Sequence, residues 1–300
     1  MKHCIALLII YFFMQELSAQ SNPLMEGVTD HFASNEGVKI HYVTKGKGPT
    51  ILFVHGFPDF WYSWREQMEA LANEYRVAAV DLRGYNRSDS PEGVENYRMP
   101  LLVSDLASVI NDLGEEPVNL VAHDWGAAVS WLLAINRSEL VEKLVILSVG
   151  HPGAGKKAPI DTTKTTYADY FVSDPFKQQL TASWFSGWVT DQEAKVHYRN
   201  AFERSDKEAM INYYKANYPT QENLKKASFR NRNTNLPNLP MPVLVIHGKK
   251  DQYLPLDGHA YTWNFVDNEF SMHVFNDAGH FIQQDESKKF TELIRQFINR

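Results

Sequence analysis

The sequence predicts an α/β fold class, in which a mostly parallel, doubly wound sheet carries an inserted helical lid. Three observations predict it. Short apolar segments typical of buried strands alternate with helical segments. This alternation stops after residue 153 and resumes at residue 243. The chain has 300 residues, of which 44% are hydrophobic, and this is enough for one large core with an insertion.

The first half of the chain supplies most of the predicted sheet. A hairpin turns at Asn35-Glu36-Gly37. Apolar runs ending in small or polar residues predict buried parallel strands, and apolar residues at helical spacing predict the helices between them. The elements expected up to residue 148 are strands at His31–Ser34, Val38–Thr44, Thr50–Gly56, Val77–Val80, Val118–Ala122 and Lys143–Ser148, and helices at Trp61–Asn73, Leu101–Leu113 and Gly126–Asn136.

The second half begins with the predicted lid. Residues 154–237 contain no strand-like run and are rich in aromatic side chains. The α/β pattern then resumes with strands at Val243–Gly248 and Met272–Phe275 and a final helix that ends at Ile298. We therefore divide the chain into a signal peptide (1–19), a first core part (20–153), a helical cap (154–237) and a second core part (238–300).

The N-terminus resembles a secretory signal peptide. A basic start, Met1-Lys2-His3, precedes the apolar run Cys4–Met14 and the small residues Ser18-Ala19. The run is short for a membrane span, which needs roughly 20 residues. We expect a cleaved signal and a secreted or periplasmic protein, with an uncleaved N-terminal anchor as the alternative. The single cysteine, Cys4, lies in this segment, so the mature chain would contain no disulfide.

Composition excludes several classes of partner. The formal net charge is −6, and the lysines occur as short surface doublets, so we expect neither nucleic acid nor an anionic membrane surface as a partner. Clusters of His, Cys and carboxylate residues with metal-ligand spacing are absent from the sequence, and no cofactor is implied. The expected partner is a small apolar molecule; the sequence does not indicate an oligomeric state.

The most informative segment is the strand Val118–Ala122 followed by His123-Asp124-Trp125-Gly126. A strand, a sharp turn and a helix form the context of a nucleophile elbow, and small neighbours allow the turn. The residue at the tip is Asp124. A carboxylate attacks a saturated carbon that bears a strained or good leaving group, and it forms an ester that can be hydrolysed. Taken alone, Asp124 is equally well explained as a helix N-cap.

Two further residues follow predicted strands in the order that a catalytic triad requires. Asp251 follows the strand Val243–Gly248, and His280 follows the last strand. Each alone is a common turn or helix-start residue, but their order and strand-end positions predict one site. The backbone N–H groups of Phe57 and Trp125 are the candidate oxyanion donors.

Residues 30–300 resemble the α/β-hydrolase-fold epoxide hydrolases. The motifs that carry the resemblance are His55-Gly56-Phe57-Pro58, Trp61-Tyr62-Ser63-Trp64-Arg65, Asp81-Leu82-Arg83-Gly84-Tyr85, His123-Asp124-Trp125-Gly126, Asp251 and Ala278-Gly279-His280. The resemblance implies that an epoxide and water give a vicinal diol through an ester on Asp124. It also implies two lid tyrosines that bind the epoxide oxygen. Tyr167 and Tyr214 match those positions, with neighbouring Tyr170 and Tyr213 as the alternatives.

Two other functions stay open at this point. Haloalkane and haloacetate dehalogenases share the Asp–His–Asp residues but need N–H donors to a halide. Trp125 is one candidate, and only Trp184 or Trp188 is available as the second, so the tyrosine pair favours the epoxide. The third possibility is a non-catalytic binder of a lipid-like ligand. The chain departs from the family pattern at Asn86, Ala122 and Ala127, where glycine is usual.

Overall fold

A computed structural model describes residues 22–114, 117–154, 167–218, 220–224 and 236–300. One eight-stranded sheet forms its centre, in the order β1-β2-β4-β3-β5-β6-β7-β8. β1 and β2 form the predicted hairpin, β2 pairs antiparallel with β4, and the remaining pairs are parallel. The strands are β1 Thr29–Asn35, β2 Val38–Lys45, β3 Thr50–Val54, β4 Arg76–Val80, β5 Val118–His123, β6 Val141–Leu147, β7 Val243–Gly248 and β8 Phe270–Phe275.

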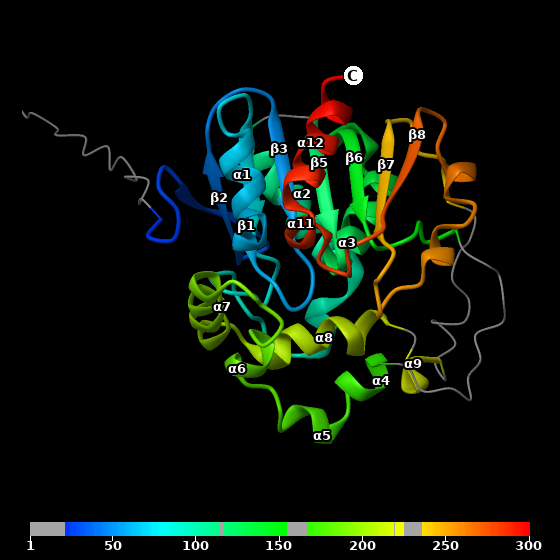
Figure 1. Cartoon of the computed structure of the whole chain (residues 1–300). Coiled ribbons are helices and arrows are strands. Elements are labelled where there is room, and N and C mark those ends of the chain that lie inside the picture. Colours follow the sequence, from blue (N-terminus) through cyan, green and yellow to red (C-terminus); the bar gives the residue numbers. More distant parts are fainter. Residues whose placement is uncertain (1–21, 115–116, 155–166, 219, 225–235) are drawn as a thin grey trace, which may run out of the picture.

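Helices cover both faces of the sheet, as Figure 1 shows. Helices α1 (Arg65–Leu71) and α12 (Ser287–Ile298) pack together on one face, and α2 (Met99–Leu113) packs with α3 (Asp124–Asn136) on the other. The central strands β3 and β5 are buried along their whole length, because both faces are covered. Short helices complete the core: η1 Trp61–Trp64, η2 Val94–Tyr97, η3 Ser138–Leu140, η4 Leu256–His259, η5 Thr262–Phe265 and α11 Ile282–Asp285.

A helical insertion lies between β6 and β7, at one end of the sheet (Figure 1). Its helices are α4 Tyr167–Phe171, α5 Asp174–Lys177, α6 Ala182–Phe185, α7 Gln192–Arg204, α8 Lys207–Asn217 and α9 Gln221–Leu224. The longer ones begin at acidic caps: Asp191 accepts the first N–H groups of α7, and Asp206 does the same for α8. The predicted fold class, a mostly parallel sheet with an inserted lid, is therefore confirmed.

Two predictions fall wholly or partly outside the residues that the structure describes. The predicted signal peptide, residues 1–19, lies outside them, and so do parts of the predicted cap, at 155–166 and 225–235. Among the residues that the structure does describe, no helix has the length and apolar character needed to cross a membrane. The predicted domain bounds and the secreted or periplasmic location stay predictions.

Candidate active site

Asp124 follows β5 directly and is the first residue of α3, where the chain makes a tight turn. Its φ of 50° places it in the left-handed region, which an L-residue rarely adopts. Two glycines leave room for this turn. A Cβ on Gly56 would lie 2.3 Å from the Cβ of Asp124, and one on Gly126 would lie 2.4 Å from the carbonyl oxygen of His55. The turn therefore projects the Asp124 carboxylate beyond the end of the sheet, as an elbow requires.

The structure brings Asp124, Asp251 and His280 together. Nε2 of His280 lies 3.6 Å from Oδ2 of Asp124. Nδ1 of His280 bonds Oδ2 of Asp251 at 2.8 Å. The other oxygen of Asp251 accepts the N–H groups of Tyr253 and Leu254, at 2.8 Å and 3.1 Å. These bonds fix the Asp251 carboxylate, which in turn orients the imidazole with Nε2 toward Asp124.

This cluster holds a protonated histidine between two ionised carboxylates. Burial favours neutral His280, but the bonds and charges of Asp124 and Asp251 outweigh it and raise its pKa to about 9. Burial likewise opposes ionisation of Asp251, yet its bond to His280 lowers its pKa to about 2. The pKa of Asp124 is also lowered, because the interaction with His280 outweighs burial. Asp124 is therefore an ionised carboxylate, as a nucleophile must be.

One predicted oxyanion donor points at the nucleophile. The N–H of Phe57 donates to Oδ1 of Asp124 at 2.8 Å. Trp125 is the next residue of α3, in the first turn, where backbone N–H groups have no partner within the helix. The nearby His55 holds the loop: its Nδ1 donates to the carbonyl of Gly56, at 2.8 Å, and its Nε2 accepts the N–H of Leu82, at 3.0 Å.

Tyr167 on α4 and Tyr214 on α8 line a cavity of about 360 Å³ together with Asp124 and His280. Burial raises the pKa of both phenols, so both keep their protons. The two alternative tyrosines are used elsewhere. The hydroxyl of Tyr170, which is 46% exposed, donates to Gln179 at 3.2 Å. The buried Tyr213 donates to the carbonyl of Arg83 at 2.8 Å.

The rest of this cavity is mainly aromatic. Trp188 stacks on Phe281 with their ring centroids 3.7 Å apart. The remaining lining residues are Phe57, Pro58, Phe171, Trp184, Gly187 and Tyr253. A second cavity of about 260 Å³, lined by residues that include Trp125, Trp131 and Tyr218, also reaches Asp124 and Tyr167. Asp124 and Tyr167 therefore line both cavities.

Three residues at the site were missed by the sequence analysis. His123 donates from Nε2 to the carbonyl of His280 at 2.8 Å, and burial lowers its pKa to about 3, so it is neutral. The ring of Tyr253 lies 5.3 Å from that of His280. The ring of Tyr218 lies 5.4 Å from that of Tyr167. The position of His123 beside the elbow was the one available signal, since the other two depend on how the loops and the lid fold back.

Comparisons with known proteins identify the family of this chain. Residues 49–287 match the model of the alpha/beta hydrolase fold. The chain is 30% identical over 292 residues to epoxide hydrolase 1 of Caenorhabditis elegans, covering 92% of this chain and 72% of that protein. The structure of a mutant epoxide hydrolase from Bacillus megaterium, complexed with its product (R)-3-[1]naphthyloxy-propane-1,2-diol, superposes with a TM-score of 0.78, at 30% identity, over 90% of this chain and 100% of that one. An epoxide hydrolase from Vigna radiata, VrEH1, gives a TM-score of 0.78 at 28% identity, over 92% of this chain and 99% of that one. The chain thus belongs to the epoxide hydrolase family of the α/β-hydrolase fold.

Proposed function

We propose that this protein hydrolyses an epoxide to a vicinal diol through an ester on Asp124. One observation carries the proposal: an ionised carboxylate at a strained turn lines the same cavity as two protonated phenols, Tyr167 and Tyr214. A carboxylate together with two proton donors fits a three-membered ring, which needs attack at carbon and a proton at oxygen.

In the first half-reaction, an oxygen of Asp124 attacks one ring carbon and the C–O bond of the epoxide breaks. The leaving oxygen would become a strongly basic alkoxide, so Tyr167 and Tyr214 bind it and one of them transfers its proton. The products of this step are a hydroxyalkyl ester on Asp124 and one phenolate, which regains its proton from solvent.

In the second half-reaction, His280 removes a proton from water, and the resulting hydroxide attacks the ester carbonyl. His280 must first be neutral. Esterification removes the negative charge of Asp124, one of the two charges that raise the pKa of His280, so the first half-reaction itself favours the neutral base. The N–H of Phe57, joined by that of Trp125, stabilises the tetrahedral anion. Collapse of this anion breaks the ester C–O bond, and the departing alkoxide takes the proton held by His280 to give the diol. Asp124 then returns its remaining proton to His280 and is again a carboxylate.

The walls of the two cavities favour an apolar epoxide with an aryl group. Aromatic faces line the larger cavity, and the second cavity leaves room for a substituent on the other ring carbon. The naphthyloxy diol bound by the relative from Bacillus megaterium is of this chemical class. We therefore expect the epoxide that gives this diol on hydration to be a substrate.

Trapping the intermediate tests the proposal. In His280→Gln the first half-reaction proceeds and the second stalls, so incubation with the naphthyloxy epoxide should increase the intact mass by one substrate. Peptide mapping should place the added mass on Asp124. Asp124→Ala is the matched control and should gain none. Full multiple-turnover activity in His280→Gln would contradict the mechanism.

Oxygen-18 water gives an independent test in the unmodified protein. Since water attacks the ester carbonyl rather than the epoxide carbon, a single turnover should label the Asp124 carboxylate and leave the diol unlabelled. Label in the diol after one turnover would instead indicate direct attack by water on the ring.

A bromoalkane separates the proposal from the dehalogenase alternative. Trp184 and Trp188, the candidate halide donors, both line the larger cavity. The indole nitrogen of Trp188 is, however, buried beneath the cavity surface, out of reach of a bound halide in this arrangement. We expect ester formation with the epoxide and none with 1-bromohexane; the reverse result would assign the protein to the dehalogenases.

A further inference from the structure

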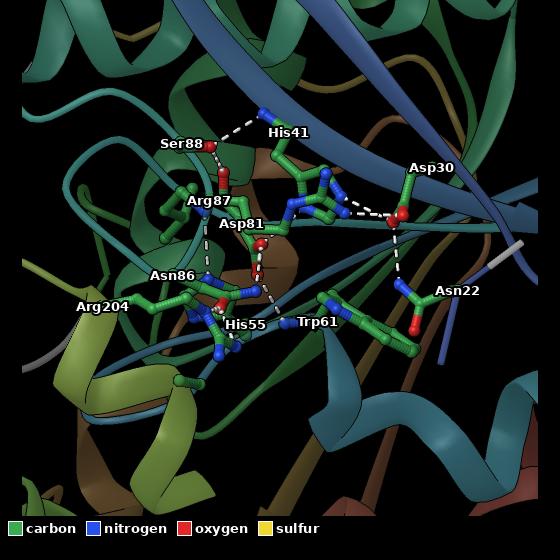
Figure 2. Close-up of polar contacts among 12 residues, drawn as sticks. Asn22, Asp30, His41, His55, Trp61, Asp81, Asn86, Arg87, Ser88 and Arg204 are labelled. Atoms are coloured by element: carbon green, nitrogen blue, oxygen red, sulfur yellow. Dashed lines mark hydrogen bonds and ion pairs between the residues drawn. The ribbon is translucent and has the colours of Figure 1, made fainter. Parts of the chain in front are cut away.

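The loop of residues 81–88, which follows β4, carries a chain of buried polar groups, as Figure 2 shows. Asp81 is fully buried in it. One oxygen of Asp81 accepts the N–H of Trp61, at 3.0 Å. The other accepts Nδ1 of His41 at 2.6 Å and Nδ2 of Asn86 at 2.8 Å. His41 in turn contacts Asp30 at 2.9 Å through Nε2.

Asn86 connects this buried chain to the lid. Its side-chain oxygen accepts two bonds from Arg204, at 3.1 Å from Nε and 2.8 Å from Nη2. Its backbone N–H donates to Oγ of Ser205 at 2.8 Å. Arg204 is the last residue of α7, and Figure 2 shows it reaching from the lid toward Asn86. An amide can do this because it offers a donor to Asp81 and an acceptor to Arg204 at once.

The backbone conformation at Asn86 favours glycine, which indicates that asparagine is present here for its side chain. Its φ of 46° lies in the left-handed region, where glycine is the least strained residue. Asparagine is among the few other residues that visit this region. Three side-chain hydrogen bonds, one to Asp81 and two from Arg204, offset the strain that glycine would avoid.

The chain turn at Arg204 and Ser205, called here the α7–α8 corner, directly precedes α8, the helix that carries Tyr214. Arg204 and Ser205 end α7, and α8 begins two residues later, at Lys207. The same loop of the core also holds α8 at its middle, since Tyr213 donates to the carbonyl of Arg83. Tyr214 is the next residue along α8, so its position above the cavity depends on this loop.

A series of hydrogen bonds also connects this loop to the nucleophile. The N–H of Leu82 donates to His55, and His55 donates to the carbonyl of Gly56. Phe57, the next residue, donates its N–H to Asp124. The loop of residues 81–88 therefore contacts both α8, which carries Tyr214, and the segment next to the nucleophile Asp124.

We propose that Asn86 is a positioning residue that sets Tyr214 over Asp124 for the ring-opening step. The inference depends on the proposed function, because it assigns Tyr214 the role of acid. Loss of the Asn86 side chain would remove the two bonds from Arg204 and loosen the α7–α8 corner. Ester formation, which needs Tyr214, would slow. Ester hydrolysis, which needs His280 and Asp251, would not.

The test measures the two half-reactions separately, with enzyme in excess over the naphthyloxy epoxide and rapid quenching. Asn86→Gly deletes the side chain and suits the backbone, so we expect a folded protein. Ester formation should slow about tenfold, since a displacement of about 1 Å can cost about 100-fold and this corner keeps its other contacts. The rate of ester hydrolysis should stay within about twofold of the parent rate.

Two more variants identify the contact. Arg204→Met breaks the two bonds to the side-chain oxygen of Asn86 from the exposed lid side and keeps the bond between Asn86 and Asp81. The double variant should be no slower than the slower single variant, because both changes remove the contact between Asn86 and Arg204. Ser88→Ala is the matched control. It removes bonds to Asp81 and His41 in the same loop but touches no lid residue. It should lower the unfolding temperature and leave ester formation unchanged.

The outcomes are distinct. An unchanged rate of ester formation in Asn86→Gly, or equal slowing of both half-reactions, would overturn the role of Asn86 while leaving the proposed function intact. Slowing of ester formation in Ser88→Ala to the same extent would also overturn it, since the cause would then be loss of loop stability. Absence of an ester in the parent and in His280→Gln would overturn the proposed function and this inference together.

Discussion

Gly56→Ala tests how closely the nucleophile is packed. The added Cβ would lie 2.3 Å from the Cβ of Asp124 and 2.6 Å from its Oδ1. Carbon atoms in contact lie about 3.5 Å apart, so one of the two backbones must move by about 1 Å. A displacement of this size at a reacting group costs about 100-fold in rate. Overpacking of this kind also destabilises a fold by about 1–3 kcal/mol.

Rapid-quench measurement of ester formation is the assay, with Gly258→Ala as the matched control, because a Cβ there would meet no atom within 4 Å. We expect Gly56→Ala to alkylate about 100-fold more slowly and Gly258→Ala to match the parent. In an Asp124→Gly background the clash disappears, so Gly56→Ala should cost measurably less stability there. A folded Gly56→Ala protein with the parent rate of ester formation would refute the reasoning.

Two other predictions concern proton transfer. Tyr167→Phe combined with Tyr214→Phe should slow ring opening by about 10²–10⁴-fold, since both proton donors are lost; each single variant should be less affected, and unchanged rapid-quench alkylation in the double variant would show that the acid lies elsewhere. Asp124→Asn should lower the pKa of His280 from about 9, because a raised histidine pKa falls when a neighbouring negative charge is removed. An NMR titration of the imidazole measures this pKa. A value that stayed at about 9 would contradict the assigned interaction between ionised Asp124 and protonated His280.

The sequence predicted the sheet because its strands are local apolar runs. Burial on both faces gives β3 and β5 a continuous apolar pattern, and their ends locate Gly56 and Asp124. Boundaries were less accurate: α3 begins at Asp124 rather than Gly126, since the elbow residue already belongs to the first turn. A helix start of this kind leaves no distinct pattern in the sequence.

The lid shows where sequence reasoning ends. Tyr213 and Tyr214 are adjacent on one helix, and which of them faces the cavity depends on how α8 docks on the core. The contact between Asn86 and Arg204 spans 118 residues of sequence. No periodic pattern encodes a contact of this kind, because it arises from the meeting of two separately folded segments.

The left-handed turn at Asp124 has a consequence for redesign. Any replacement of the nucleophile must also adopt a φ near 50°. Asparagine and glycine do so readily, whereas threonine, valine and isoleucine, which are branched at Cβ, would be strained there before any chemistry is considered. A library intended to change the reaction at this position should therefore omit the branched residues. It can explore asparagine and glycine without altering the backbone that presents them.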